Sequence, residues 1–174
     1  MPIDPARPFK PVRIAILTIS DSRSTDDDTS GDTLVELLTG AGHELAARAI
    51  IRDETDLIVS RLHNWIDDPA VDVVITTGGT GLTGRDVTPE ALHRLDGKDI
   101  PGFGELFRWI SFQKIGTSTI QSRACAVVAR GTYIFALPGS TGAVTDAWEG
   151  ILESQLDSRH RPCNFVDLIP RLME

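Results

Sequence analysis

Apolar positions along this chain follow two different spacings, and the two alternate from one end to the other. Some runs are short and almost continuously apolar, which is typical of strands buried on both faces of a parallel sheet. Such runs predict strands over 12–19, 46–51, 71–77, 124–129 and 133–137. Between them, apolar residues recur every three or four positions, as on one face of a helix. This spacing predicts helices over 32–40, 56–66, 88–95, 105–114 and 143–156.

Strands that alternate with helices indicate βαβ units, and therefore an α/β fold with a mainly parallel sheet and helices on both faces. The short turn 130–132 between the last two strands predicts one antiparallel strand at an edge of the sheet. Neither a linker nor an internal repeat interrupts 12–156, so we expect residues 12–174 to form a single domain. Residues 1–11 contain four prolines and few apolar residues, and they are predicted to be a flexible leader.

Polar residues ahead of two helices predict where each helix begins. Thr29 or Ser30 is suited to be the N-cap of the first helix. Thr88 is suited to be the N-cap of a later one, with Pro89 at the first helical position. The acidic run 26–28, just before the first helix, is expected to belong to a mobile loop.

Composition and charge narrow the class of protein. A hydrophobic content of 41% and a mean hydropathy of −0.05 are those of a soluble globular domain. The formal net charge of −8 argues against an extended surface for nucleic acid or anionic membrane. We expect neither a transmembrane helix nor a signal peptide. The two cysteines, Cys125 and Cys163, have no metal-ligand spacing and are predicted to be reduced thiols in the cytoplasm.

The segment 75–90 contains the strongest chemical signal of the chain. It joins a predicted strand to a predicted helix through a loop that holds four glycines. Glycine has no Cβ and tolerates positive φ, so such a loop can bring several backbone N–H groups close to an anion. Arg85 and Asp86 stand at the far end of the loop. Backbone donors beside a carboxylate predict a site for a nucleotide or another phosphorylated ligand, with a metal ion between them.

Three more polar loops follow the carboxyl ends of predicted strands. Together with the glycine-rich loop 78–86, they comprise 20–23, 52–53 and 138–142. In open α/β sheets, ligands bind outside the carboxyl ends of the strands, close to the point where the strand order reverses. We therefore expect the loops to surround one shared crevice that is the active site.

The two candidate carboxylates also have ordinary structural explanations. Asp86 can cap a helix or pair with Arg85, but Thr88 is the better cap, so we favour a functional role for Asp86. Asp53 lies in an acidic cluster, and such clusters are usually solvated loop or first-turn residues. Both readings of Asp53 stay open at this point.

Basic residues provide few further candidates. Arg23, Arg85 and Arg123 are candidate phosphate contacts, although an arginine is more often a surface residue. The four histidines show neither ligand spacing nor a neighbouring nucleophile, and we assign them no catalytic role.

Two common nucleotide-binding patterns fit poorly. Residues 79–84 match G-x-G-x-x-G, with Asp99 at about the distance of a ribose-binding acid. In a dinucleotide fold, however, this motif follows the first strand and opens a helix directly, whereas here it follows the third strand and the helix starts later. A P-loop is excluded because no Lys-Ser/Thr pair closes the glycines.

The segment 103–112 holds four of the ten aromatic residues of the chain. Phe103 and Phe107 share one helical face and are expected to lie in the core, whereas Trp109 and Phe112 point elsewhere. A helix that is apolar on more than one side favours an interface between subunits.

Six blocks of sequence together resemble the MoaB/Mog family of molybdenum cofactor biosynthesis proteins. The blocks occur in the same order as in that family: DTSGD (28–32), TTGGTGLTGRDVTPEAL (76–92), FGELFR (103–108), IGTSTIQSR (115–123), LPGSTGAV (137–144) and RPCNF (161–165). The resemblance runs from residue 12 to the end of the chain. It implies a three-layer α/β/α sandwich that assembles as a homotrimer or homohexamer.

The resemblance also implies an activity. Adenylyltransferase members of the family transfer AMP from MgATP to the terminal phosphate of molybdopterin and release pyrophosphate. We therefore expect molybdopterin and ATP as ligands, Mg²⁺ as the metal, no tightly bound organic cofactor, and contact with other proteins of the same pathway. The alternative is a non-catalytic molybdopterin-binding or assembly protein. One departure bears on this choice, because Thr141 stands where many transferase members have proline.

Residue roles carried over from the family fall on three loops and one pair. The two functional aspartates, which we expect to hold Mg²⁺, correspond to Asp53 and Asp86. The expected substrate and nucleotide contacts are Gly78, Gly79, Thr80, Gly81, Ser122, Arg123, Pro138, Gly139 and Ser140.

Overall fold

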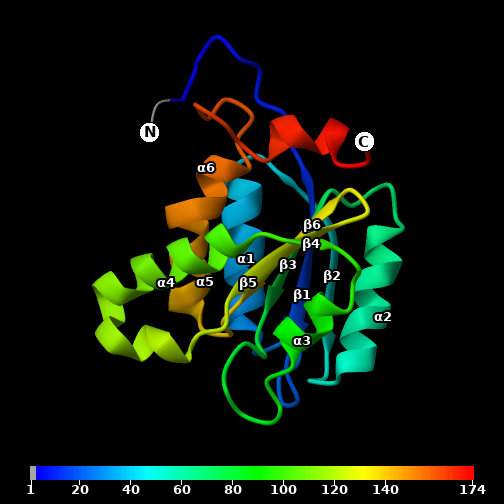
Figure 1. Ribbon diagram of the computed structural model, residues 1–174, viewed down its shortest axis with the longest axis vertical. Helices are drawn as coiled ribbons and strands as arrows, with labels where there is room; N and C mark the ends of the chain where they lie inside the picture. Colours follow the sequence, from blue (N-terminus) through cyan, green and yellow to red (C-terminus); the bar gives the residue numbers. More distant parts are fainter. Residues whose placement is uncertain (1–2) are drawn as a thin grey trace.

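The computed structural model describes residues 3–174 and has a six-stranded sheet with helices on both faces (Figure 1). The sheet order is β2-β1-β3-β6-β5-β4. The first three pairs in this order are parallel, and β5 runs antiparallel to both β6 and β4. The strands are β1 (Arg13–Ile19), β2 (Glu44–Ile51), β3 (Val73–Thr77), β4 (Lys98–Asp99), β5 (Cys125–Ala129) and β6 (Thr132–Leu137). The expected α/β fold with a mainly parallel sheet is confirmed.

Helices form the two outer layers of the sandwich. One layer contains α1 (Thr29–Gly40), α4 (Pro101–Ile115), α5 (Thr141–Ala147) and α6 (Glu153–Gln155). The other contains α2 (Thr55–Ile66) and α3 (Thr88–His93). Three shorter helical segments are η1 (Gly116–Gln121), η2 (Trp148–Leu152) and η3 (Val166–Arg171).

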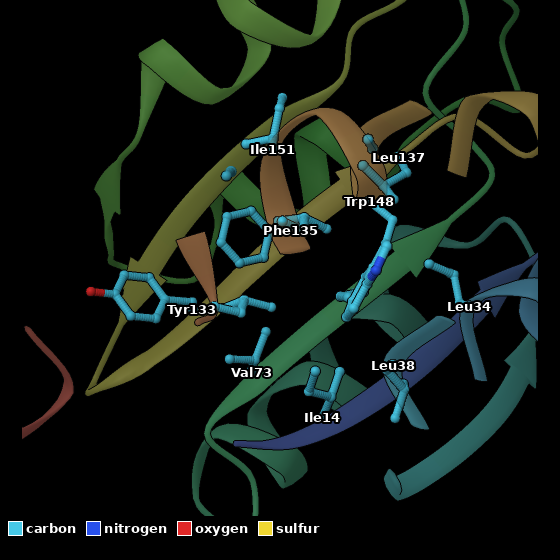
Figure 2. Close-up of a cluster of buried hydrophobic side chains, with 14 of the residues drawn as sticks. Ile14, Leu34, Leu38, Val73, Tyr133, Phe135, Leu137, Trp148 and Ile151 are labelled. Atoms are coloured by element: carbon cyan, nitrogen blue, oxygen red, sulfur yellow. The ribbon is translucent and has the colours of Figure 1, made fainter. Parts of the chain in front are cut away.

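The core has two parts because successive residues of a strand face opposite sides of the sheet. On one side, Ile14 and Phe135 pack with residues of α1 and with Trp148, as Figure 2 shows. On the other side, Ala15 and Ile134 pack against α2 and α3. Burial of both faces removes the need for polar positions within a strand, which explains the continuous apolar runs.

The region 96–104, between the predicted helices 88–95 and 105–114, is not simply a loop. Lys98 and Asp99 form β4 at the sheet edge, antiparallel to β5, and α4 already begins at Pro101. Gly97 permits the close approach, since a Cβ at this position would lie 2.7 Å from the carbonyl oxygen of Val128. A two-residue strand has no measurable period, so hydrophobic spacing does not detect it.

The expected helix 143–156 is also divided in the structure. It begins as α5, passes through a π-helical turn at η2 and ends as α6. A π turn replaces i→i+4 by i→i+5 hydrogen bonds over one turn only, and this leaves the apolar spacing almost unchanged. The periodicity therefore predicts the helix but not its internal change.

The segment expected to be a flexible leader makes several contacts with the C-terminal part of the chain. The backbone N–H of Asp4 donates to the carbonyl of Arg159 at 2.9 Å, and Ile3 forms an antiparallel bridge with His160. Farther along, Arg7 pairs with Asp167 at 2.6 Å. Figure 1 shows the N-terminal segment beside the C-terminal one, at the end of the molecule opposite the loops that follow β1 and β3.

Within residues 3–174, no helix combines the length and the apolar character needed to cross a membrane. Cys125 and Cys163 are both free thiols, in agreement with the expectation of reduced cysteines. Burial raises the pKa of the Cys125 thiol to about 11, so this side chain is neutral at physiological pH.

Candidate functional site

A cavity of about 700 Å³ lies at the carboxyl ends of β1, β3 and β6. Its lining includes residues of all four polar loops that follow strands, namely 20–23, 52–53, 78–86 and 138–142. These loops are far apart in sequence, and the parallel arrangement of β1, β2, β3 and β6 brings them to the same edge of the sheet. The structure thus places the loops around one shared crevice, as the sequence analysis expects.

The first turn of the glycine-rich loop requires glycine at Gly78. Its φ is +106°, and an added Cβ would lie 2.1 Å from the carbonyl oxygen of Ile19. The N–H of Gly78 donates to the carbonyl of Leu137 at 3.0 Å, and its own carbonyl accepts from the Thr88 hydroxyl at 2.8 Å. The amide of Gly78 therefore fixes the loop to β6 and is not available to a ligand.

The next amides of the loop differ from that of Gly78. The N–H groups of Gly79 and Thr80 donate to no residue among 3–174, although both residues line the cavity. The N–H of Gly81 is directed to the carboxylate of Asp86. Two backbone donors, rather than the whole glycine run, are consequently free to meet an anion.

Asp86 is held by its own loop. Its Oδ2 accepts hydrogen bonds from the hydroxyl and the N–H of Thr83 at 2.7 and 2.8 Å. The bond from the Thr83 hydroxyl is the main reason that the pKa of Asp86 lies below its ordinary value. Arg85 pairs with Asp21 instead, at 2.7 Å, so the alternative of an Arg85–Asp86 ion pair is wrong.

The start of α3 also differs from its prediction. Val87 occupies the cap position and Thr88 is already the first helical residue. The Thr88 hydroxyl is used to bind the Gly78 carbonyl, so it cannot cap the helix. Because α3 begins four residues after Gly84, the glycines do not open a helix as they do in a dinucleotide-binding motif.

Asp53 is part-buried in the same cavity and forms no ion pair within residues 3–174. Burial raises its pKa, and the negative charges of Asp21 and Asp86 raise it further. A hydrogen bond from the backbone N–H of Asp21 and the positive charge of Arg85 act in the opposite direction without cancelling these effects. A Cβ on Gly79 would lie 3.0 Å from Asp53 Oδ1, so this carboxylate packs directly against the loop. Asp53 and Asp86 thus flank the two free amides.

Two carboxylates that repel each other beside free amides fit a divalent cation bound together with phosphate. Mg²⁺ prefers oxygen ligands and is usually bound by one or two carboxylates plus phosphate oxygens. Asp53 and Asp86 are the residues that would hold it. Among residues 3–174 there is no group of three or more His, Cys, Asp or Glu residues suited to bind a metal ion without such help.

The three candidate arginines all have protein partners. Arg23 lines the cavity and donates to Ser30 Oγ at 2.5 Å and to the carbonyl of Gly139 at 2.7 Å. Arg123 lies outside the cavity lining and donates to the carbonyls of Gly81 and Asp86, each at 2.7 Å. Its guanidinium therefore holds the glycine-rich loop in shape, and the expected direct phosphate contact by Arg123 is not what this geometry supports.

The remaining expected contacts lie on two other parts of the cavity wall. Pro138, Gly139 and Ser140 follow β6, and the Ser140 hydroxyl accepts from the N–H of Ala143 at 3.2 Å to start α5. Ser122 follows η1 and also lines the cavity.

One wall of the cavity was not predicted from the sequence. It is formed by α4 and η1, which contribute Phe107, Ser111, Ile115, Ser118 and Thr119. The sequence analysis assigns the apolar residues of this helix to the core or to an interface. Small hydroxyl residues in the block 115–123 were the available signal, but only the fold places them opposite the glycine-rich loop.

The last residue of the acidic run 26–28 also differs from its prediction. Asp28 is fully buried and is the N-cap of α1, since its Oδ1 accepts from the N–H of Gly31 at 3.1 Å. Its Oδ2 binds the Thr18 hydroxyl and Arg48, both at 2.7 Å. The expected cap at Thr29 or Ser30 is therefore wrong, and Asp28 does not belong to the expected mobile loop, whereas Asp26 and Asp27 are exposed ahead of the helix. The buried ion pair ties α1 to β1 and β2 beneath the site.

Comparison with known proteins agrees with this geometry. A family model described as "Probable molybdopterin binding domain" matches residues 15–158. Molybdenum cofactor biosynthesis protein B of Escherichia coli (strain K12) is 52% identical over 157 residues, covering 90% of this chain and 92% of that protein.

Solved structures show the same likeness. A crystal structure of molybdenum cofactor biosynthesis protein B has a TM-score of 0.82 at 44% identity, covering 84% of this chain and 92% of the other. The tungsten cofactor synthesizing protein MoaB from Pyrococcus furiosus has a TM-score of 0.79 at 32% identity, covering 95% and 99%. This chain therefore belongs to the molybdopterin-binding-domain family that includes the MoaB and Mog proteins of molybdenum cofactor biosynthesis.

Proposed function

We propose that this chain binds molybdopterin and transfers AMP from MgATP to its terminal phosphate, with release of pyrophosphate. The observation that carries the proposal is the pairing of two free backbone donors, at Gly79 and Thr80, with two flanking carboxylates, Asp53 and Asp86. Family membership supports molybdopterin as the acceptor substrate, since the matching family model describes a molybdopterin-binding domain.

The charges of the site suit a polyphosphate that arrives with a cation. The charged form of Asp53 is disfavoured, because burial and the neighbouring Asp21 and Asp86 raise its pKa by more than Arg85 lowers it. Without a cation, these carboxylates would repel phosphate. With Mg²⁺ bound to the polyphosphate, the same carboxylates attract it, and the amides of Gly79 and Thr80 can receive the phosphate oxygens.

The transfer step needs little covalent help from the protein. An oxygen of the molybdopterin phosphate forms a bond to the α-phosphorus of ATP, and the bond from that phosphorus to the pyrophosphate oxygen breaks. The attacking phosphate is already ionised at neutral pH, so no strong general base is required. Positioning and charge neutralisation are then the main contributions. In agreement, the cavity within residues 3–174 has no histidine or cysteine in its lining.

The test is the transfer of label. Purified protein is incubated with molybdopterin, Mg²⁺ and ATP labelled at the α-phosphate, and we expect label to appear in the pterin fraction with one pyrophosphate released for each pterin labelled. The same mixture with EDTA should give none. If well-folded protein binds the pterin but transfers no label, the chain is instead a non-catalytic molybdopterin-binding protein of the pathway.

A single methyl group should separate catalysis from folding in the glycine-rich loop. A Cβ at Gly81 would lie 2.7 Å from Asp86 Oδ2, so Gly81→Ala must displace that carboxylate. We expect label transfer to fall about tenfold or more, because small displacements in a site are costly. The free energy of unfolding should change little, because φ at Gly81 is not positive. Gly84→Ala is the matched control, since a Cβ there meets nothing within 4 Å. Equal rates for both variants would contradict the role of Asp86.

We also propose that copies of this chain associate through α4 and η1. Trp109 is 64% exposed and Ile120 is 80% exposed, and both lie in these two segments. Phe112 and Ile115 are exposed beside them, which is a large apolar surface for a single chain in water. Closed homo-oligomers bury such surfaces, and the resemblance to the family favours a trimer or a hexamer.

Replacement of Trp109 by Glu should break this assembly. Light scattering after gel filtration should show the wild-type protein at three or six times the 18.9 kDa of one chain and the variant at a lower mass. Leu57→Glu is the control, because Leu57 is exposed on α2, away from the proposed interface. A wild-type protein that is monomeric at micromolar concentration would overturn the proposal.

The setting of this reaction follows from its substrates. We propose a cytoplasmic location, because the transfer needs ATP and the free thiols Cys125 and Cys163 fit a reducing compartment. An adenylylated pterin must also pass to the protein that uses it, and we propose contact with other proteins of the pathway.

A further inference from the structure

A second cavity, of about 510 Å³, lies at the opposite end of the molecule from the first. It is enclosed by three parts of the chain: the N-terminal segment with Ile3 and Phe9, the turn between α1 and β2 with His43, and the helical segment 149–159. In Figure 1 the N-terminal segment and α6 mark this end. No residue of this cavity belongs to the proposed transfer site.

His43 presents a hydrogen-bond donor to this cavity. The side chain is only 5% exposed, and its Nδ1 accepts from the N–H of Val12 at 3.3 Å. Burial keeps the pKa of His43 below its ordinary value, so the ring is neutral and the proton is on Nε2. That N–H group has no hydrogen-bond partner among residues 3–174. It is not among the polar side-chain atoms that are both shielded from solvent and unpartnered, so it is accessible and can donate to a ligand in the cavity.

His160 lines the same cavity and is 3% exposed. Its ring makes no hydrogen bond to any residue of the described part of the chain, while its backbone carbonyl accepts from Asn164 at 3.1 Å. Two nearly buried imidazoles with free ring nitrogens therefore face one space.

The cavity also carries negative charge that is only partly compensated, since Lys114 pairs with Asp146 and also attracts Glu149. Glu149 and Glu153 line it on one face of the helical segment, and neither forms an ion pair within 3–174. Asp157, one turn farther on, is paired with Arg159 at 2.8 Å. The guanidinium of Arg159 also lies 5.1 Å from the ring centre of Phe9, so it is held at the wall.

We propose that this cavity binds a small organic cation, a protonated amine or a guanidinium, that also carries a hydrogen-bond-accepting oxygen. Glu149 and Glu153 bind the cationic group, Phe9 and Ile3 contact its apolar stem, and His43 Nε2–H donates to the oxygen. The volume lies in the range of small-molecule sites. An organic cation fits better than a bare metal ion, since the described residues form no three-ligand group.

The test uses Nα-acetylargininamide as probe and Nα-acetylcitrullinamide as its uncharged analogue, with full-length protein in a calorimeter. We expect one probe bound per chain and no binding of the analogue. The double variant Glu149→Gln/Glu153→Gln should bind the probe about tenfold more weakly. Glu36→Gln, an exposed glutamate on α1 outside the cavity, should leave the affinity unchanged.

Two further readings separate this site from the first cavity and identify the donor. Asp86→Asn should keep full affinity for the probe, whereas loss of affinity in that variant would place the cation at the transfer site and overturn the proposal. In long-range proton–nitrogen NMR spectra, the Nε2 signal of His43 should move on addition of probe.

A blocked pentapeptide with arginine at its centre forms the last arm. Binding equal to that of the free probe would identify a protein side chain as the source of the cation, and selective binding of the probe would identify a small molecule. Absence of heat together with an unmoved His43 signal would refute the site. The result is independent of label transfer in the first cavity, so either proposal can fail alone.

Discussion

Replacement of Asp28 by Asn should lower the free energy of unfolding by about 3 kcal/mol, the size expected when one partner of a buried ion pair is removed. Asp28 is fully buried and has three kinds of partner: the hydroxyl of Thr18, the guanidinium of Arg48 and the N–H of Gly31. The variant leaves Arg48 without its buried charge, although Arg48 keeps its second pair with Asp32 at 2.7 Å.

The pH dependence of this effect has a definite sign. Burial by itself raises the pKa of Asp28, but the hydrogen bonds from Arg48, Thr18 and Gly31 outweigh it, and the pKa in the folded protein is lowered. A carboxyl group with a lowered pKa stabilises the fold fully above its unfolded pKa of about 3.9, and this contribution is lost as the pH falls through the folded pKa. The difference between wild type and variant should therefore shrink below about pH 4.

Urea unfolding followed by circular dichroism at pH 7 and near pH 3 measures both effects. Asp26→Asn is the matched control, because Asp26 is exposed in the same run of three aspartates and forms no ion pair within the described residues. Equal stability of the two variants at pH 7 would show that the buried network contributes little.

The fold was largely predictable because the sheet is covered on both sides. Ile14 and Ala15 are adjacent and are buried in different halves of the core, so the apolar run is continuous and easily recognised. What could not be predicted depends on partners distant in sequence. Lys98 and Asp99 form a strand only because β5 provides an edge for pairing. A segment of two residues has no hydrophobic pattern that would predict a strand.

The site shows the same division. The carboxyl ends of parallel strands lie at the same edge of a sheet. This general property predicts one cavity that is lined by Asp53, 78–86 and 138–140. The hydrogen-bond partner of each residue in these loops cannot be predicted from this property. Gly78 has an amide like those of its neighbours, but this one binds Leu137, and the guanidinium of Arg123 binds carbonyls rather than a ligand. Likewise, Asp28 is one of three consecutive aspartates, and only the fold buries it.

Replacement of Asp53 by Asn should reduce AMP transfer about 10²-fold or more, the usual size when a group that stabilises the transition state through charge is removed. Asp53 is the better of the two aspartates for this test. Asp86 accepts bonds from the hydroxyl and the N–H of Thr83, so its replacement also disturbs the loop, whereas no side chain within residues 3–174 donates to the carboxylate of Asp53. The measurement is the rate of label transfer as a function of Mg²⁺ concentration, and the variant should require more Mg²⁺.

The same variant should not lose stability. Burial and the charges of Asp21 and Asp86 raise the pKa of Asp53, so its ionised form is less favourable in the folded protein than in the unfolded one. For such a group the fold is more stable below the unfolded pKa and becomes less stable as the pH rises, so the neutral Asn removes a penalty at pH 7.

We therefore expect Asp53→Asn to unfold at the same or a slightly higher urea concentration than wild type while losing transfer. Asp56→Asn is the control, since Asp56 belongs to the same acidic cluster but is exposed and pairs with Arg94. Full activity in Asp53→Asn would remove Asp53 from the proposed Mg²⁺ site. A clear loss of stability in Asp53→Asn would instead make Asp53 a structural residue. Without such a loss, the retention of a carboxylate whose charged form is disfavoured in the fold is explained by its function, since functional sites commonly cost stability.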